Sequence, residues 1–155
     1  MVGLLRISGP RCDLINSIEW IAFGDSIALG VAQAAGLLCN AVVGRMPDAV
    51  LVAIASTSPE FISGRKVLVS SGLSNNPDGR SYVEQQIVTL LAAEAKRVVL
   101  LGVGPAVRAG TNEWLADLAT RSGKQVIFAG PLRPVRPDGI HPYYDQLVDQ
   151  INAVL

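Results

Sequence analysis

Trp20-Ile21-Ala22-Phe23-Gly24-Asp25-Ser26 is the stretch that decides the fold. Its apolar run is typical of a buried strand, and the Gly-Asp-Ser that follows is typical of a turn into a helix. Further along the chain, short runs rich in Val, Ile and Leu alternate with longer helical patterns. This alternation predicts an α/β chain, a three-layer α/β/α sandwich around a mainly parallel sheet. The strands are predicted at residues 20–23, 40–43, 66–70, 97–102 and 125–129.

The helices are predicted from apolar spacing and from residues typical of helix ends. Gly36 and Gly123 are expected to end two of them, because glycine readily adopts the left-handed conformation of a helix C-cap. Ser81 lies three residues before a glutamate, the spacing of a capping box at the start of a third helix. Pro142 suits the first position of the last helix. Residues 47–55 fit a short helix, with a strand as the alternative.

The length and composition limit the number of domains and the class of partner. A chain of 155 residues, half of them hydrophobic, is long enough for one core and too short for two ordinary domains. We therefore expect a single domain over residues 19–155, preceded by a lead-in segment over residues 1–18. Thirteen basic and thirteen acidic residues balance without a long run of one charge. No nucleic acid or anionic membrane surface is expected as a partner.

The remaining composition bears on location and on metal binding. No apolar run approaches the roughly 20 residues that span a bilayer, so no transmembrane segment is predicted. Residues 1–10 lack the organisation of a secretory signal, so a cytoplasmic location is the default expectation. Cys12 and Cys39 lack metal-binding spacing and are expected to be free and structural, with a disulfide as the alternative. No metal and no cofactor are expected.

Three residues form a candidate set for nucleophilic catalysis. Ser26 follows the first strand, and His141, the single histidine of the chain, lies three residues after Asp138. A serine hydroxyl needs a base to take its proton, and a histidine base works best when a carboxylate orients it. Each residue also has a plainer interpretation: Asp25 or Ser26 as a helix cap, and Asp138 as part of a turn. Taken together, the set favours serine-based hydrolysis.

These residues resemble the SGNH or GDSL hydrolase superfamily, in which a Gly-Asp-Ser turn opens the domain and an Asp-x-x-His block closes it. Phe23-Gly24-Asp25-Ser26 matches the first block, and Asp138-Gly139-Ile140-His141-Pro142 matches the last. The resemblance covers residues 19–155 and implies the SGNH hydrolase fold, with a flavodoxin-like five-stranded sheet. It also implies a serine esterase in which Ser26 is the nucleophile, His141 the base and Asp138 its carboxylate partner.

The resemblance further implies an oxyanion hole, the set of N–H donors that binds the developing negative charge. The backbone N–H groups of Ser26 and Gly44 fit two of its donors. Asn75 is the expected side-chain donor, although the chain has one residue more than the family between glycine and asparagine. Asn76 is the alternative register. Gly44 and Asn75 are also ordinary residues of a surface turn.

The expected substrate is a small-molecule or saccharide ester with a short acyl group, because a chain of this length has few loops for a deep acyl tunnel. Within the superfamily, the small members that resemble this chain include esterases that remove acetyl groups from carbohydrates. The alternatives are a non-catalytic carbohydrate- or ligand-binding module and a lysophospholipase- or thioesterase-type hydrolase. A nucleotide-binding domain is less favoured, since Gly102-Val103-Gly104-Pro105 is neither a P-loop nor a dinucleotide fingerprint. The sequence carries no prediction of oligomeric state.

Overall fold

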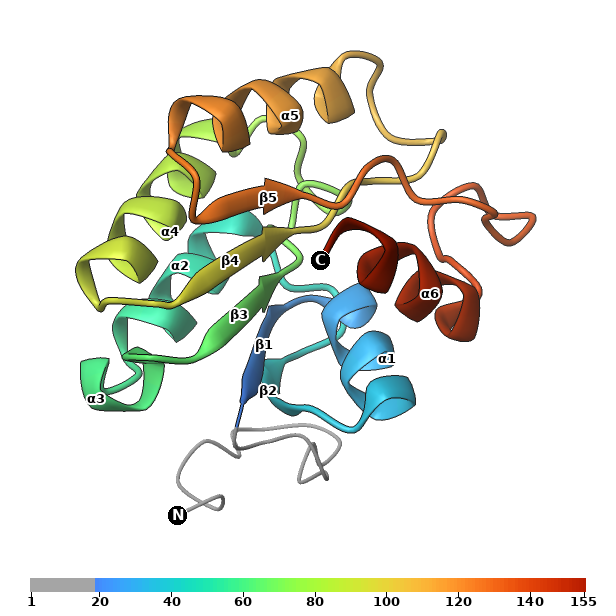
Figure 1. Ribbon diagram of the computed structural model, residues 1–155. Coiled ribbons are helices and arrows are strands. Elements are labelled where there is room, and N and C mark those ends of the chain that lie inside the picture. The colour runs from blue at the N-terminus through green and yellow to red at the C-terminus, as the bar shows by residue number, and fades with distance from the viewer. Residues whose placement is uncertain (1–18) are drawn as a thin grey trace.

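A sheet of five parallel strands forms the centre of the structure, a computed structural model that describes residues 19–155 (Figure 1). The lead-in segment expected over residues 1–18 lies outside the described residues. The strand order is β2-β1-β3-β4-β5, which confirms the predicted flavodoxin-like sheet, and every neighbouring pair is parallel. The strands are β1 (Trp20–Gly24), β2 (Leu38–Ala41), β3 (Lys66–Val69), β4 (Arg97–Leu100) and β5 (Val126–Phe128).

Helices cover both faces of this sheet and complete the predicted three layers. Helices α1 and α6 lie on one face, and α2, α4 and α5 lie on the other (Figure 1). The helices are α1 (Ser26–Ala35), α2 (Pro47–Ala55), α3 (Pro59–Ile62), α4 (Arg80–Ala92), α5 (Thr111–Arg121) and α6 (Tyr144–Val154). Among them, no helix is long and apolar enough to cross a bilayer.

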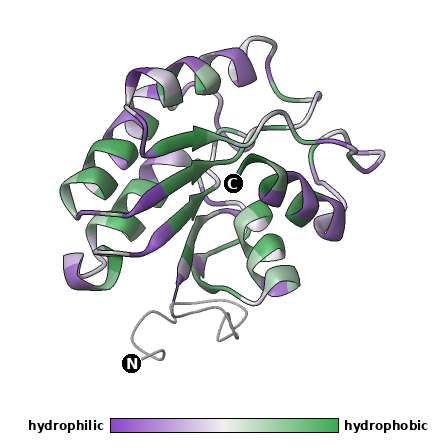
Figure 2. Ribbon diagram, in the orientation of Figure 1, coloured by the Kyte–Doolittle hydropathy of each residue, from purple (hydrophilic) through white to green (hydrophobic). Residues whose placement is uncertain are grey.

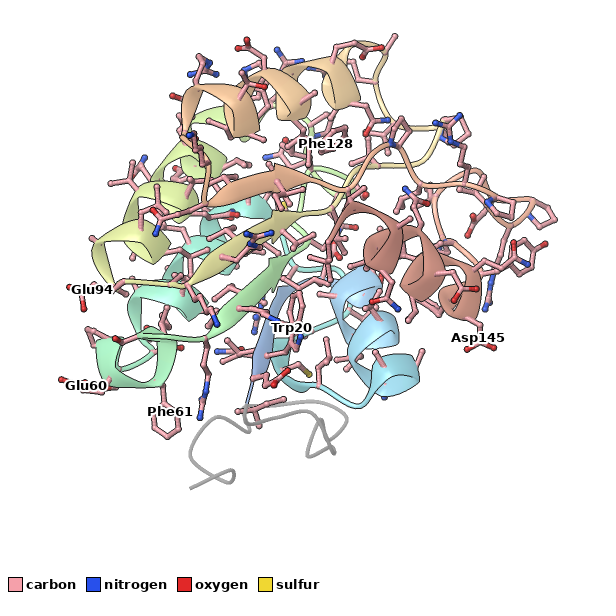
Figure 3. The ribbon with its side chains drawn as sticks, in the orientation of Figure 1. Trp20, Glu60, Phe61, Glu94, Phe128 and Asp145 are labelled. Atoms are coloured by element: carbon pink, nitrogen blue, oxygen red, sulfur yellow. The ribbon has the colours of Figure 1, made fainter. Side chains whose placement is uncertain are left out.

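The strands are mainly apolar, as expected for strands buried on both faces; the exceptions are Asn40 on β2 and the first residues of β3 and β4, Lys66 and Arg97 (Figure 2). Side chains alternate between the faces, so Phe23 packs in the core under α2, α4 and α5, and its neighbour Ala22 packs under α1 and α6. Burying a side chain such as Phe23 contributes about 1.5 to 3 kcal/mol. The charged side chains of Glu60, Glu94 and Asp145 point outward (Figure 3).

Two predicted helix starts are wrong, and neighbouring structure explains both. Helix α6 begins at Tyr144, not at Pro142, because Pro142 pairs with Val135 in an antiparallel bridge that holds it outside the helix. Helix α4 begins one residue before Ser81, with Gly79 as its cap, so Ser81 does not form a capping box. The predicted ends at Gly36 and Gly123 are confirmed, since both follow their helices with positive φ.

The expectation of free cysteines is also wrong for the described residue, because Cys39 takes part in a disulfide. Cys12, the other cysteine of the chain, lies outside the described residues. Sequence spacing could not decide this point, because a disulfide depends on the distance between two Cα atoms, which spacing does not give.

Candidate active site

The chain passes from β1 to β2 on one side and to β3 on the other, so the direction in which strands are added to the sheet reverses at β1. Open parallel sheets bind ligands at such a point, at the carboxyl ends of the strands. Gly24 ends β1 and allows its neighbours to approach. Its φ is +143°, and a Cβ atom there would lie 2.2 Å from the carbonyl oxygen of Ser70, just beyond β3. On the other side, the Gly24 carbonyl accepts the N–H of Val42, just beyond β2 (3.0 Å). A glycine is therefore required at the start of the Gly-Asp-Ser turn.

Asp25, not Ser26, caps helix α1. The Asp25 carboxylate is buried and accepts the N–H of Ile27 through Oδ1 (3.0 Å). Burial raises the pKa of Asp25 above its ordinary value, against the opposing effect of its hydrogen bonds. Because Asp25 satisfies the start of the helix, the Ser26 hydroxyl at the first helical position is left for another partner.

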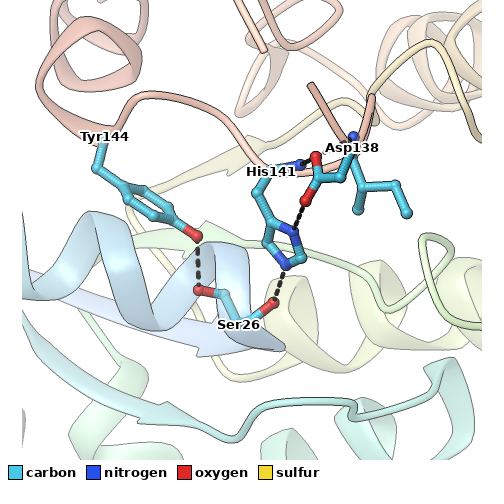
Figure 4. Close-up of polar contacts among 5 residues, drawn as sticks. Ser26, Asp138, His141 and Tyr144 are labelled. Atoms are coloured by element: carbon cyan, nitrogen blue, oxygen red, sulfur yellow. Dashed lines mark hydrogen bonds and ion pairs between the residues drawn. The ribbon is translucent and has the colours of Figure 1, made fainter. Parts of the chain in front are cut away.

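That partner is His141, which lies 115 residues further along the chain (Figure 4). Ser26 Oγ is 3.1 Å from His141 Nε2, and His141 Nδ1 is 2.6 Å from Asp138 Oδ2. An ionised carboxylate only accepts hydrogen bonds, so Nδ1–H donates to Asp138, and Nε2 is left to accept the Ser26 hydroxyl proton. The structure thus brings together the three residues that the sequence singled out, with the imidazole between hydroxyl and carboxylate.

Asp138 is ionised because the backbone around it supplies donors. Its Oδ1 accepts the N–H groups of Ile140 (2.8 Å) and His141 (2.9 Å), while Oδ2 accepts the ring N–H. The hydrogen bond from the His141 N–H is the largest cause that lowers the pKa of Asp138, which falls from 3.8 to about 2. The carboxylate is therefore charged at neutral pH and oriented by its own loop before any ligand binds.

Backbone hydrogen bonds hold the loop that carries these two residues. The Gly139 carbonyl accepts the N–H of Ala106, from the segment after β4 (2.9 Å). The His141 carbonyl accepts the N–H of Arg136 (2.8 Å), next to the bridge between Val135 and Pro142. The loop is thus fixed from two sides, although the side chains of His141 and Asp138 are 38% and 46% exposed and reach solvent.

Besides Ser26, the expected oxyanion donors are Gly44 and Asn75, which lie on two loops that contact each other. Asn75 Nδ2 donates to the carbonyl of Arg45, next to Gly44 (3.0 Å). An amide NH2 has two hydrogens, so this bond leaves one for a ligand. Asn76 instead accepts the N–H of Asp78 through its side-chain oxygen, a local turn bond (3.1 Å). Gly44 is exposed with φ +77°, and its N–H has no hydrogen bond to any residue of 19–155.

Arg45 is a residue of this region that the sequence did not single out. Its Nη1 donates to the backbone and side-chain oxygens of Asn40, both at 3.1 Å, and Asn40 is fully buried on β2. Burial lowers the pKa of Arg45, and the negative charge of Asp25 opposes that shift. The half-buried guanidinium therefore partly offsets the buried charge beside the nucleophile. The only sequence signal for this residue is that it directly follows Gly44.

No metal centre accompanies this site in the described part of the chain. Within residues 19–155, no group of three or more His, Cys, Asp or Glu side chains is placed to hold a metal ion. The chemistry available here is that of a hydroxyl, an imidazole and a carboxylate, aligned next to the N-terminus of a helix.

No family model and no curated protein sequence matches the chain. Solved structures do. The catalytic domain of peptidoglycan O-acetyltransferase A from Streptococcus pneumoniae, solved with a methylsulfonyl adduct, is 16% identical with a TM-score of 0.62, over 88% of this chain and 92% of that one. A putative acylhydrolase from Bacteroides fragilis is 14% identical with a TM-score of 0.60, over 88% and 83%. The chain has the fold of the SGNH/GDSL hydrolases.

A third solved structure agrees with this SGNH/GDSL fold. A GDSL-like lipase from Bacteroides thetaiotaomicron is 14% identical with a TM-score of 0.58, over 96% of this chain and 89% of that one. The three proteins are named as an O-acetyltransferase, a putative acylhydrolase and a GDSL-like lipase.

Proposed function

We propose that this chain is a serine hydrolase that cleaves carboxylic esters through an acyl-enzyme. The observation that carries the proposal is the line of contacts from Ser26 Oγ through His141 to Asp138, at 3.1 Å and 2.6 Å. In this arrangement the imidazole accepts the serine proton as the hydroxyl attacks, and the carboxylate stabilises the imidazolium that forms.

The reaction then proceeds in two halves. In the first, Ser26 Oγ bonds to the ester carbonyl carbon, the bond from that carbon to the alcohol oxygen breaks, and His141 gives its proton to the departing alcohol. In the second, His141 takes a proton from water, the hydroxide attacks the acyl-enzyme, and the acid leaves as Ser26 regains its proton. Asp138 stays ionised throughout, which agrees with its pKa of about 2.

The oxyanion of each tetrahedral intermediate needs N–H donors, and three are proposed. The Ser26 N–H belongs to the first turn of α1, whose N–H groups have no partner within the helix. The Gly44 N–H and the second hydrogen of the Asn75 amide are the others. The bond from Asn75 to Arg45 supports Asn75 over Asn76, because it ties that side chain to the loop of Gly44.

Replacing Asn75 with alanine is expected to lower kcat by about 10² to 10³, the usual effect of losing one oxyanion donor, with a much smaller change in KM. The matched control is Asn76→Ala, which removes an amide of the same loop and is expected to keep kcat within about threefold. Steady-state hydrolysis of p-nitrophenyl acetate measures both. If Asn76→Ala caused the larger loss, the donor would be Asn76, in the alternative register.

The proposed substrate is an ester with a short acyl group, such as an O-acetyl group on a carbohydrate. The exposure of His141 and Asp138 supports a shallow site. A cavity of about 350 Å³ is lined by residues that include Trp20 and Lys66, the first residues of β1 and β3, so it lies at the opposite end of those strands from Ser26. The likeness in fold to a peptidoglycan O-acetyltransferase also supports acetyl transfer chemistry.

Activity is expected to fall as the acyl chain lengthens. In a series of p-nitrophenyl acetate, butyrate and octanoate, we expect kcat/KM to be highest for acetate and lower by about tenfold or more for octanoate. The physical reason is that a shallow, exposed site buries little of a long chain, so added methylenes gain little of their usual transfer free energy. A preference for octanoate would instead favour the lysophospholipase or thioesterase alternative.

The direct test of the proposed function combines turnover with trapping. The purified chain is incubated with p-nitrophenyl acetate, and separately with a fluorophosphonate or a sulfonyl fluoride, and the labelled peptide is identified by mass spectrometry. We expect ester turnover that stops when Ser26 is labelled. Absence of both turnover and labelling would favour the non-catalytic binding module.

A further inference from the structure

We infer that Tyr144 is a positioning residue that holds Ser26 in place against His141 by binding the main chain of Ser26; this inference rests on the proposed function. Tyr144 is the first residue of α6, and its hydroxyl donates to the Ser26 carbonyl at 3.2 Å (Figure 4). The sequence gives no sign that this tyrosine forms a hydrogen bond. The contact joins α6 directly to the turn that carries the nucleophile.

The segment from His141 to Tyr144 contacts Ser26 at two points. His141 Nε2 meets the side-chain oxygen, and the Tyr144 hydroxyl meets the backbone oxygen. The two contacting residues are three positions apart along the chain, so movement of α6 relative to α1 changes both contacts together. The Tyr144 bond therefore sets how far the imidazole lies from the hydroxyl whose proton it accepts.

The ring of Tyr144 reaches Ser26 because α1 has a glycine one turn further on. A Cβ atom at Gly30 would lie 2.2 Å from the Cε1 and Cζ atoms of the Tyr144 ring. The two helices can therefore pack closely only while residue 30 has no side chain. This glycine lies inside a helix, where it costs about 1 kcal/mol relative to alanine, and the packed ring gives a reason for it.

Burial, together with the nearby negative charges, keeps the Tyr144 hydroxyl protonated and able to donate, although Arg136 opposes the effect. Burial is the main cause that raises the pKa of Tyr144 above its ordinary value, and the negative charge of Asp25 adds to the shift. The phenol therefore keeps its proton across the pH range in which an ester is hydrolysed. Arg136 lies near the Tyr144 ring, 5.8 Å from its centroid, and its backbone N–H binds the His141 carbonyl. The hydroxyl, the ring and the histidine loop thus form one connected unit.

Replacing Tyr144 with phenylalanine keeps the ring on Gly30 and removes only the hydroxyl. With p-nitrophenyl acetate, we expect kcat to fall about tenfold, KM to stay within about twofold, and the melting temperature to change little, since one hydrogen bond is lost. The matched control is Tyr143→Phe, whose exposed side chain makes no hydrogen bond within residues 19–155. Equal kcat values for the two variants and the wild type would overturn the inference.

A second pair of variants tests the ring contact. Gly30→Ala alone is expected to lower kcat, because the added methyl displaces the Tyr144 ring. In a Tyr144→Ala background the ring is absent, so Gly30→Ala should cause no further loss of kcat. If the two substitutions each lowered kcat by their full factor in the double variant, Gly30 would act independently of the Tyr144 ring. That result would overturn the inferred link between Gly30 and Tyr144.

A third measurement separates this inference from the proposed function. The chain has one histidine, so the Hε1 proton resonance of His141 is observed alone, whether or not the chain hydrolyses an ester. We expect Tyr144→Phe to produce a large part of the chemical-shift change that Ser26→Ala produces, and Tyr143→Phe to produce little. If the chain showed these chemical-shift changes but no ester turnover, only the hydrolase proposal would be overturned. If the resonance of His141 did not move in Tyr144→Phe, the positioning role would be overturned.

Discussion

Replacing Ser26 with alanine is expected to lower kcat/KM for p-nitrophenyl acetate by about 10⁵ to 10⁶. Within residues 19–155, Ser26 supplies the hydroxyl that lies on His141 Nε2, at 3.1 Å. Without that oxygen no acyl-enzyme forms, and the imidazole has no serine proton to accept. The loss should fall on kcat, because the groups that bind the ester remain.

The fold of the Ser26→Ala variant is expected to be unchanged. The helix cap comes from Asp25, whose carboxylate binds the Ile27 N–H, and alanine is a better helix former than serine. Circular dichroism and the melting temperature check this point. Ser81→Ala, an exposed serine on α4, is the matched control and should keep full activity. Undiminished turnover in Ser26→Ala would falsify the assignment of the nucleophile.

The sheet could be predicted because the signal for each strand is local. Within the predicted run 97–102, residues 98–101 are all Val or Leu, as expected for strands buried on both faces, and β4 forms within that run. The ends of α1 and α5 could also be predicted from a local signal, since Gly36 and Gly123 adopt the left-handed conformation that few other residues accept.

The features that the sequence did not predict depend on specific contacts within the loops rather than on the preference of each residue. Pro142 would suit a helix start by its own preference, but its bridge to Val135 delays the helix to Tyr144. Arg45 has no pattern that announces its bonds to the buried side chain of Asn40. Such contacts follow from the packing of loops at one edge of the sheet, which a linear pattern does not specify.

The candidate site lies between these two cases. Ser26, Asp138 and His141 could be proposed from sequence because each lies in a short local pattern at a predicted helix start or turn. Their meeting across 115 residues follows from topology, since parallel strands place all their carboxyl ends on one edge. The hydroxyl of Tyr144 could not be found this way, because the sequence does not say which face of α6 meets α1.

Replacing Asp138 with asparagine is expected to lower kcat by about 10⁴ while leaving KM within a few-fold. The carboxylate accepts the His141 Nδ1–H at 2.6 Å and so keeps the other ring nitrogen free to accept the Ser26 proton. An amide offers its own N–H groups to Nδ1, which favours the tautomer that presents a proton to Ser26 and cannot act as base. The side chain keeps its size, so the geometry of the loop is preserved.

Asp149→Asn, which changes an exposed carboxylate on α6, is the matched control and should keep full kcat.

The stability of the fold, measured over a pH series, gives a second readout. Hydrogen bonds in the folded chain lower the pKa of Asp138 from 3.8 to about 2, so the folded state binds the proton less well than the unfolded state does. This stabilisation is complete above about pH 5 and is lost as the pH falls through 3.8 and then through about 2, because below the lower value the carboxylate is protonated in both states. The difference in the free energy of unfolding between wild type and Asp138→Asn should therefore shrink over that pH range. In the kinetic assay, a kcat for Asp138→Asn equal to that of Asp149→Asn would remove Asp138 from the catalytic set.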